Sequence, residues 1–362
     1  EVIQIKAFGL ENIVSQRYKE YLKERLRILL KKEVLLQKIG FIRGGSGNII
    51  NVIILFVAGM SIVAGNMTIG MLVSFCSYME KFFEALSKIM ELNLNKQEVV
   101  VSYERMNEIL NSEKEENNGI ILKEPIQKIQ FRQVIFGYKD NLVLKKIDLS
   151  IENPGLYSLV GSNGCGKSTI FKLLERFYEC KVGKIEINQV PINKYSASDL
   201  RNNIVYMPKK PFFLQGTIMD NLKLGQNEIS DLEVIEVCKK VGIHSDIQKL
   251  EKGYYELIES GGENFSSGQK QKLGFVRVLL KKADIVLLDE VTSDLDGEAE
   301  RQICNQIEEI AKKAIVLNIA HKPESIRRSK KVFFIQGGKI VAEGTHKALM
   351  KNCVDYKKIF AN

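Results

Sequence analysis

The sequence contains no C-x-x-C pair, although six cysteines are spread over its 362 residues. This scattered spacing argues against a zinc site and against the disulfide framework of a small secreted protein. We therefore expect free thiols in a reducing cytosol. The chain also starts at Glu1 instead of methionine and shows no signal peptide, so we expect either a fragment or the product of a truncated gene.

Charged side chains are absent between Gly44 and Met79, a stretch of about 36 residues. One straight helix of that length would overshoot the hydrocarbon core of a bilayer, which needs only ~20 residues. We therefore predict a hairpin of two membrane spans, at about 45–64 and 68–90, with the lipid bilayer as a partner. The break is expected at Gly65–Thr68. The alternative is a buried hairpin of a soluble protein, because several Asn, Ser and Gly residues dilute the hydropathy.

Acidic residues are in the minority: 44 Asp and Glu stand against 53 Lys and Arg, which gives a net charge of +9. Such an excess is typical of proteins that bind nucleic acid or a cytoplasmic membrane surface. The basic residues cluster in residues 1–43, beside the predicted spans, so anionic lipid explains them and no nucleic acid is expected. Basic flanks around an uncharged turn place both ends in the cytoplasm. We expect an integral protein of the cytoplasmic membrane.

The remaining residues divide into a helical part, a linker and a mixed domain. Apolar residues at helical spacing predict helical extensions on both sides of the spans, so that residues 1–110 form one α-helical unit. The polar stretch 111–125 is predicted to be a linker. Over 126–362, short apolar runs alternate with amphipathic helices, which indicates an α/β domain with a largely parallel sheet. The candidate strands are 129–131, 156–160, 204–206, 285–288, 315–319 and 332–335.

One glycine-rich segment matches the phosphate-binding pattern G-x-x-x-x-G-K-[ST]. Its nucleotide-binding residues are Gly161, Ser162, Asn163, Gly164, Cys165, Gly166, Lys167, Ser168 and Thr169. Glycines let the backbone curl so that N–H groups face phosphate oxygens, and the helix expected over 168–177 adds the positive end of its dipole. Lys167 is expected to reach the β- and γ-phosphates of ATP, and the Ser168 hydroxyl to bind Mg²⁺.

A pair of carboxylates ends the predicted strand at 285–288. Asp289 is expected to bind Mg²⁺, and Glu290 to polarise the attacking water. A further strand over 314–319 ends close to His321, which is a second candidate catalytic residue because it could contact the γ-phosphate. The other two histidines are expected to be structural or on the surface.

The segment from Asn264 to Lys272 resembles the signature sequence of ABC ATPases. Together with Tyr138, the phosphate loop, Asp289-Glu290 and His321, it makes 126–362 similar to an ABC nucleotide-binding domain, a P-loop NTPase. The resemblance implies that Tyr138 stacks on adenine, that His321 is the switch histidine and that 293–296 communicates across a dimer. In a head-to-tail dimer, one copy's signature would close on the ATP of the other. The implied nucleotide-binding residues there are Ser266, Ser267, Gly268 and Gln269.

Residues 5–11 resemble the start of the fifth long helix of ABC exporters, so the predicted hairpin corresponds to the fifth and sixth spans of a half-transporter. The resemblance implies an exporter subunit that hydrolyses ATP, pairs with a second half-transporter and moves an unknown substrate.

Two departures from the family pattern bear on the rate of ATP hydrolysis. Lys209 stands where the family usually places a Gln that touches Mg²⁺, and a cation cannot bind Mg²⁺. The signature has Phe265 and Ser267 in place of Leu and Gly. We expect slow ATP hydrolysis. The alternatives are a degenerate or regulatory partner in a heterodimeric transporter, and a soluble ABC ATPase that acts on nucleic acid.

Overall fold

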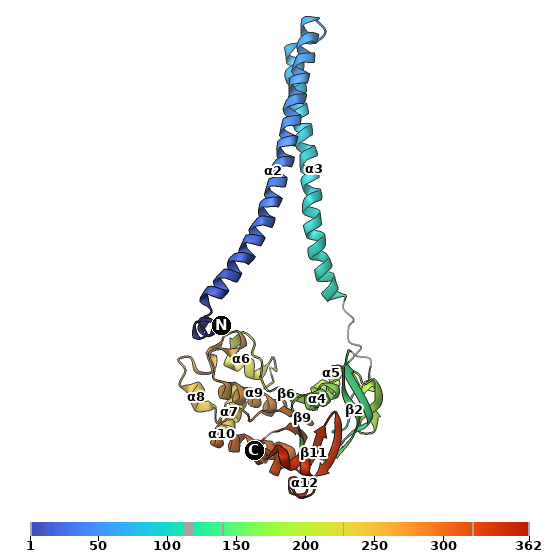
Figure 1. Ribbon diagram of the computed structural model, residues 1–362, viewed down its shortest axis with the longest axis vertical. Helices are drawn as coiled ribbons and strands as arrows, with labels where there is room; N and C mark the ends of the chain where they lie inside the picture. Colours follow the sequence, from blue (N-terminus) through green and yellow to red (C-terminus); the bar gives the residue numbers. More distant parts are fainter. Residues whose placement is uncertain (1, 112–118, 140, 227, 321, 361–362) are drawn as a thin grey trace. The chain divides into compact units, whose positions relative to one another are not determined.

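The computed structural model describes residues 2–111, 119–139, 141–226, 228–320 and 322–360 (Figure 1). The chain forms two compact units, Glu1–Ser112 and Glu113–Asn362, which are described separately. The predicted catalytic residue His321 and residues 112–118 of the predicted linker lie outside the described residues.

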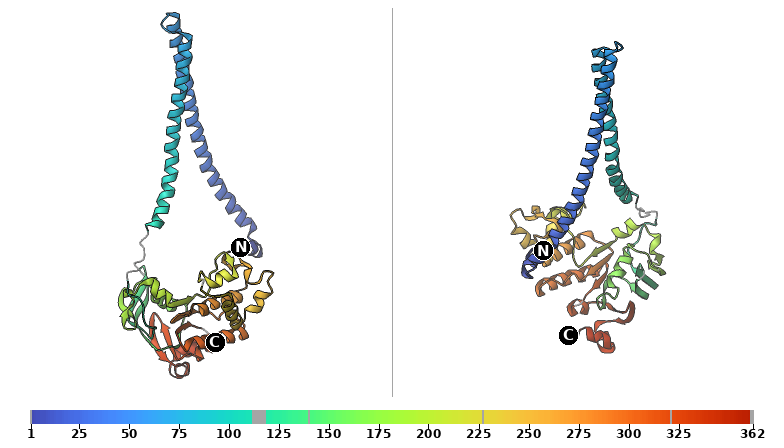
Figure 2. Two further views of the ribbon diagram at one scale, coloured as in Figure 1. Left: turned by 180° about the vertical axis from the view of Figure 1, so that it is seen from behind. Right: turned by 45° about the horizontal axis from the view of Figure 1, so that its top comes forward.

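The first unit is a helical hairpin. It consists of α1 (Val2–Ala7), α2 (Glu11–Val63) and α3 (Ile69–Leu110). Gly65 takes a left-handed φ of 80° after α2, a conformation that commonly ends helices and that glycine adopts without strain. Thr68 then caps α3, because its side-chain oxygen accepts a hydrogen bond of 3.2 Å from the backbone N–H of Met71. Both views of Figure 2 show the two long helices converging at this turn.

Apolar side chains lie on the surface of this hairpin. Val52, Phe56 and Val63 of α2 are exposed, and so are Val73 and Tyr78 of α3. In the described part of the chain, none of the helices combines the length with the apolar character needed to cross a bilayer. The spans at about 45–64 and 68–90 stay a prediction.

The second unit contains a six-stranded sheet with the order β12-β11-β3-β10-β9-β6. Its neighbouring strands are parallel, except that the edge strand β12 is antiparallel to β11. The strands are β3 (Gly155–Gly161), β6 (Ile204–Met207), β9 (Ile285–Asp289), β10 (Ile315–Ile319), β11 (Lys331–Gln336) and β12 (Lys339–Gly344). The predicted α/β fold is thus confirmed for this sheet.

A separate antiparallel sheet departs from the predicted, largely parallel arrangement. It has the order β2-β1-β4-β5, and a further pair joins β7 (Gly216–Thr217) to β8 (Leu257–Ile258). The predicted strand 129–131 belongs to β1 and therefore lies in the antiparallel sheet. The strands of the four-stranded antiparallel sheet are β1 (Lys128–Tyr138), β2 (Asn141–Glu152), β4 (Val182–Ile187) and β5 (Val190–Pro191). Strand β2 alternates buried and exposed residues, as expected where one face of a sheet is solvated.

Helices and the second sheet bury both faces of the six-stranded sheet. Val286 and Leu288 of β9 belong to a core shared with the group α7, α9 and α10, whereas Ile285 and Leu287 belong to a core shared with β1 and α4. Alternate residues of one strand thus enter two different cores, as the two-residue period of a strand requires. Figure 1 shows α7, α9 and α10 lying close together.

Ten α-helices of the second unit are described. They are α4 (Lys167–Leu174), α5 (Ala197–Asn202), α6 (Ile218–Lys223), α7 (Asp231–Val241), α8 (His244–Gln248), α9 (Ser267–Lys281), α10 (Gly297–Ala311), α11 (Pro323–Arg327), α12 (His346–Asn352) and α13 (Val354–Ile359). Helix α4 is shorter than the predicted 168–177, because Arg176 takes a left-handed φ of 55°.

Residues 119–125 of the predicted linker belong to the second unit. Ile120 forms a bridge with Tyr195, and the N–H of Leu122 donates a hydrogen bond of 2.6 Å to Oδ2 of Asp199. The end of the predicted linker, up to residue 125, therefore runs along this domain.

Candidate nucleotide-binding site

The glycine-rich loop joins β3 to α4, and its backbone requires glycine at three positions. Gly164 and Gly166 have φ values of 79° and 105°, in the left-handed region that side chains disfavour. A Cβ on Gly161 would lie 2.2 Å from the carbonyl oxygen of Ile335. Gly166 is also the N-cap of α4, so the first N–H groups of that helix follow directly on the loop. This is the arrangement in which helix N-termini bind phosphate.

Lys167 bends back over the loop that carries it. Its ammonium donates hydrogen bonds of 2.7 Å to the carbonyl oxygen of Gly161 and 3.0 Å to that of Ser162. The residue is only 6% exposed. The positive charge is therefore held at the mouth of the loop, where an incoming phosphate would meet it.

Ser168 and Asp289 meet at the carboxyl edge of the sheet. The Ser168 hydroxyl donates a hydrogen bond of 2.8 Å to Oδ2 of Asp289, which ends β9. Because β3, β10 and β9 are parallel neighbours, their carboxyl ends lie at the same edge, which is where open α/β sheets bind ligands. The structure thus brings the two predicted Mg²⁺ ligands together.

The donor chemistry at this edge fits Mg²⁺. Hydroxyl and carboxylate oxygens suit this hard cation, which usually takes one or two protein ligands and completes its shell with phosphate oxygens and water. Among the described residues, no group of three or more His, Cys, Asp or Glu side chains gathers into a metal site. Ser168 and Asp289 are the two side chains that the structure brings together as candidate Mg²⁺ ligands.

Tyr206 is a member of the site that the sequence analysis missed. Its hydroxyl donates a hydrogen bond of 3.3 Å to the same Oδ2 of Asp289. Burial and the negative charge of Asp289 raise the pKa of Tyr206, so the phenol keeps its proton and remains a donor. In the sequence, a tyrosine within the apolar strand β6 predicts only a residue of the core.

Glu290 follows Asp289 and forms an ion pair with Lys209. The Lys209 ammonium donates a hydrogen bond to Oε2 of Glu290. That hydrogen bond, together with the charge of Glu290, raises the pKa of Lys209. Lys209 therefore has a carboxylate partner, which its position in the sequence did not predict.

Tyr138 lies in an aromatic cluster at the end of β1. Its ring makes edge contacts with Phe136 and Tyr178, at centroid distances of 5.0 and 5.1 Å. The ammonium of Lys172 lies 5.4 Å from the centre of the same ring. The cluster gives Tyr138 a fixed orientation, and it adds Tyr178 as an aromatic neighbour that the sequence analysis did not single out. Stacking of adenine on Tyr138 stays a prediction.

The signature residues form a capping box at the start of α9. The Ser266 hydroxyl accepts a hydrogen bond of 3.2 Å from the N–H of Gln269, and the Gln269 side chain accepts one of 3.0 Å from the N–H of Ser266. Ser267 begins the helix, and a Cβ on Gly268 would lie 3.3 Å from the carbonyl oxygen of Asp294. No hydrogen bond between described residues joins these four residues to the phosphate loop.

Two further residues hold the loop after Glu290: Gln271 joins it to the signature helix α9, and Lys322 joins it to α10. Gln271, which is buried, donates a hydrogen bond of 3.1 Å to Ser293 and accepts one of 3.3 Å from the N–H of Asp294. Lys322 donates bonds of 2.9 Å to the carbonyl oxygen of Thr292 and 3.0 Å to Oε2 of Glu300. Neither residue was predicted, because their partners are distant in sequence.

The two histidines that were expected to be structural have tyrosine partners. Nδ1 of His244 lies 2.8 Å from the hydroxyl of Tyr254, and Nδ1 of His346 lies 2.9 Å from that of Tyr356. Both pairs lie far from the phosphate loop in the sequence, and His346 is buried.

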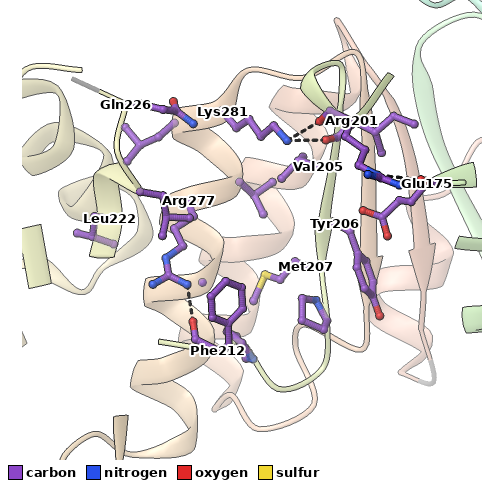
Figure 3. A pocket seen from close by; sticks show the side chains of 17 residues that line it. Glu175, Arg201, Val205, Tyr206, Met207, Phe212, Leu222, Gln226, Arg277 and Lys281 are labelled. Carbon is purple, nitrogen blue, oxygen red and sulfur yellow. Dashed lines mark hydrogen bonds between the residues drawn. The ribbon is translucent and has the colours of Figure 1, made fainter. Parts of the chain in front are cut away.

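A cavity of about 270 Å³ lies behind the site, between β6, α9 and the loop after β6 (Figure 3). Tyr206 lines it and so belongs both to the cavity and to the site of Asp289. Arg277 of α9 lines the cavity and donates a hydrogen bond of 2.6 Å to the carbonyl oxygen of Phe212. The buried carboxyl of Glu175 also lines the cavity, and its Oε2 has no hydrogen-bond partner among the described residues.

Comparisons with known proteins agree with this geometry. A family model described as ABC transporter matches residues 144–293, and one described as ABC transporter transmembrane region matches residues 3–86. An ATP-dependent lipid A-core flippase from Syntrophus aciditrophicus is 28% identical over 98% of this chain and 60% of its own length. An ABC multidrug transporter MDR2 from Trichophyton rubrum is 38% identical over 63% of this chain and 17% of its own length.

A solved structure supports the same assignment. A bacterial Atm1-family ABC exporter with ATP bound superposes with a TM-score of 0.87 at 25% identity, over 99% of this chain and 64% of that one. The chain thus spans less than two thirds of the length of these relatives. With part of a transmembrane region ahead of an ATP-binding region, the chain belongs to the ABC transporter family.

Proposed function

We propose that this chain binds ATP with Mg²⁺ and hydrolyses it as the ATPase part of an exporter in the cytoplasmic membrane. The hydrogen bond of 2.8 Å between Ser168 and Asp289 carries the proposal, because it joins the phosphate loop to the carboxylate edge. If this hydrogen bond only stabilised the fold, the buried ammonium of Lys167, the residue before Ser168, would have no role beside it.

The residues divide the work of phosphoryl transfer among them. Backbone N–H groups of the loop and the Lys167 ammonium would bind the β- and γ-phosphates, while Ser168 and Asp289 hold Mg²⁺. Bound Mg²⁺ supplies positive charge that stabilises the developing negative charge on the phosphate oxygens. Glu290 would accept a proton from the attacking water, and the family resemblance adds His321 as a contact to the γ-phosphate.

A second half-transporter is proposed as the partner. Ser266 and Gly268 lie at the start of α9, where N–H groups can face an anion, yet no hydrogen bond between described residues joins them to this chain's phosphate loop. In a head-to-tail dimer they would instead meet the γ-phosphate held by the partner. Closing and opening of that dimer would convert ATP hydrolysis into motion of the membrane part.

The hairpin is proposed to lie in the lipid bilayer. The match of residues 3–86 to a transporter transmembrane region and the exposed apolar side chains of α2 and α3 support this placement. No exported substrate is proposed, because the two long helices α2 and α3 cannot by themselves enclose a translocation path and the names of the relatives give different cargo.

Phosphate release by the purified full chain tests the proposal. We expect Mg²⁺-dependent hydrolysis of ATP that exceeds the rate of a Glu290→Gln variant, while both proteins bind ATP equally well. If the two proteins release phosphate at the same rate although both bind ATP, hydrolysis is not the function of this site.

The Lys209–Glu290 ion pair favours a second candidate function. A nucleotide-binding partner in a heterodimer would bind ATP and dimerise but leave hydrolysis to the other subunit. In that case, the chain alone would form ATP-dependent dimers with no phosphate release, and a second, different half-transporter would restore it.

A further inference from the structure

We propose that Lys209 slows ATP hydrolysis by holding the Glu290 carboxylate, so that this positioning contact must open before Glu290 can act on water. The inference rests on the proposed ATPase function. It concerns the regulation of the reaction and not the binding of ATP.

The backbone fixes Glu290 at the end of β9. Its φ of 52° lies in the left-handed region, which is uncommon for a residue with a side chain. The N–H of Glu290 donates a hydrogen bond of 3.0 Å to the carbonyl oxygen of Ile319, and its own carbonyl accepts one of 3.1 Å from Ser293. The direction in which the carboxylate leaves the chain is therefore set by the neighbouring strand and loop.

The loop that carries Lys209 is also anchored. Pro208 and Pro211 restrict its backbone, and a Cβ on Gly274 of α9 would lie 2.7 Å from Cγ of Pro211, which shows how closely the loop packs on that helix. Arg277 of the same helix holds the next residue through the carbonyl oxygen of Phe212. Lys209 thus extends from a fixed base toward Glu290.

The chemistry of lysine makes this contact different from the one that glutamine would make. An ammonium only donates, so Lys209 can pair with Glu290 but cannot bind Mg²⁺. The hydrogen bond from Lys209 to Oε2 holds the carboxylate in one orientation, so the contact must open before the carboxylate can turn toward a water molecule. The Lys209 side chain is 52% exposed, and ion pairs in contact with solvent are weak, so the contact slows the reaction without preventing it.

Steady-state kinetics of the full chain test this role. We expect Lys209→Gln to raise kcat by about two- to five-fold, the factor that a partly exposed ion pair supports, with KM for ATP unchanged. Lys209→Arg keeps the positive charge and should keep the slow rate. Lys210→Gln removes a charge from the adjacent exposed lysine and is the matched control, for which kcat should not change.

The outcomes separate this inference from the proposed function. An unchanged or lower kcat for Lys209→Gln overturns the role of Lys209, while hydrolysis itself stands. A rise in kcat that Lys209→Arg shares also overturns it, because the charge would then not matter. Absence of hydrolysis above the Glu290→Gln rate in every variant contradicts the ATPase function itself.

Discussion

The Ser168 hydroxyl donates a hydrogen bond of 2.8 Å to Oδ2 of Asp289, a residue 121 positions further along the chain. The contact exists because the parallel strands β3 and β9 end at one edge of the sheet, with β10 between them. Both oxygens are of the kind that Mg²⁺ prefers. Four consequences can be measured: one concerns this edge, one the cap of α9, one the pair of Lys322 with Glu300 and one the cavity lined by Glu175.

Asp289→Asn should separate ATP binding from hydrolysis. The amide keeps the shape of the side chain and can still bond to Ser168, but it lacks the charge that holds Mg²⁺. We expect phosphate release to fall by about 10²-fold or more, because the charged metal contributes several kcal/mol to stabilising the transition state. ATP binding measured in EDTA should stay within about two-fold of the wild type, since it depends on Lys167 and the loop.

A matched substitution keeps this test specific. Asp284→Asn removes a carboxylate that accepts a hydrogen bond of 2.9 Å from the N–H of Ile126, at the start of the same strand region and away from the phosphate loop. This variant should keep its rate of hydrolysis at saturating ATP. Equal losses in the two variants would contradict a metal-binding role for Asp289.

The phosphate loop could be predicted from the sequence because its function depends on a local pattern. Glycines at fixed spacing, one lysine and one serine specify a backbone shape without help from distant residues. Tyr206 could not be predicted in the same way. It reaches Asp289 over 83 positions, and within its own strand it resembles any other core residue. Lys209 was noticed as a departure, but its partner Glu290 became apparent only from the folded sheet.

The antiparallel sheet shows a second limit of the sequence patterns. Strand β1 was expected to join the parallel sheet, since an isolated apolar run such as 129–131 does not reveal its neighbours. In the structure it pairs with β2 and β4. The signature residues form the cap of α9 in the structure, and their predicted role as ATP ligands stays a prediction.

Ser266 should show two separable roles. Ser266→Ala removes the cap of α9 and should lower the free energy of unfolding by about 1 kcal/mol. Ser266→Asp preserves the cap, because aspartate accepts the same hydrogen bond, and should leave stability nearly unchanged. Its negative charge would oppose the γ-phosphate of a partner's ATP. We therefore expect ATP-driven dimers, measured by size-exclusion chromatography in the Glu290→Gln background, to be lost in Ser266→Asp.

One result for Ser266→Asp would contradict the role of the signature in the dimer. If Ser266→Asp dimerises with ATP as well as the parent protein does, the signature does not close on a phosphate. Ser266→Thr supplies the control, since threonine retains both the cap and the hydroxyl.

Lys322→Ala should destabilise the second unit through Glu300. The Lys322 ammonium pairs with Oε2 of Glu300, whose Oε1 is buried and has no hydrogen-bond partner in the described part of the chain. Removing the lysine leaves the carboxylate largely buried and uncompensated, which costs about 1–3 kcal/mol. Urea unfolding followed by tyrosine fluorescence measures the loss; the sequence has no tryptophan. Lys347→Ala, at an exposed position, should not shift the midpoint, and equal shifts would contradict the assignment.

Glu175 should make the stability of the second unit depend on pH. Burial raises the pKa of this carboxyl from 4.5 to about 7, and the charges of Arg201 and Lys281 offset part of that effect. The folded chain therefore holds a proton that the unfolded chain has released between pH 4.5 and 7, so this group's contribution to stability falls as the pH rises through that window. Above pH 7 the full cost of ionising a buried carboxyl remains.

Glu175→Gln removes that cost, because the amide stays neutral at every pH. We expect the variant to be more stable than the wild type at pH 8, by on the order of 1–3 kcal/mol, and nearly equal to it at pH 5. Glu179→Gln, four residues along at an exposed position, should show no such difference between the two pH values. Urea midpoints at pH 5 and pH 8 provide the measurement. A stability difference between Glu175→Gln and the wild type that is the same at both pH values would mean that the carboxyl of Glu175 does not titrate in this window.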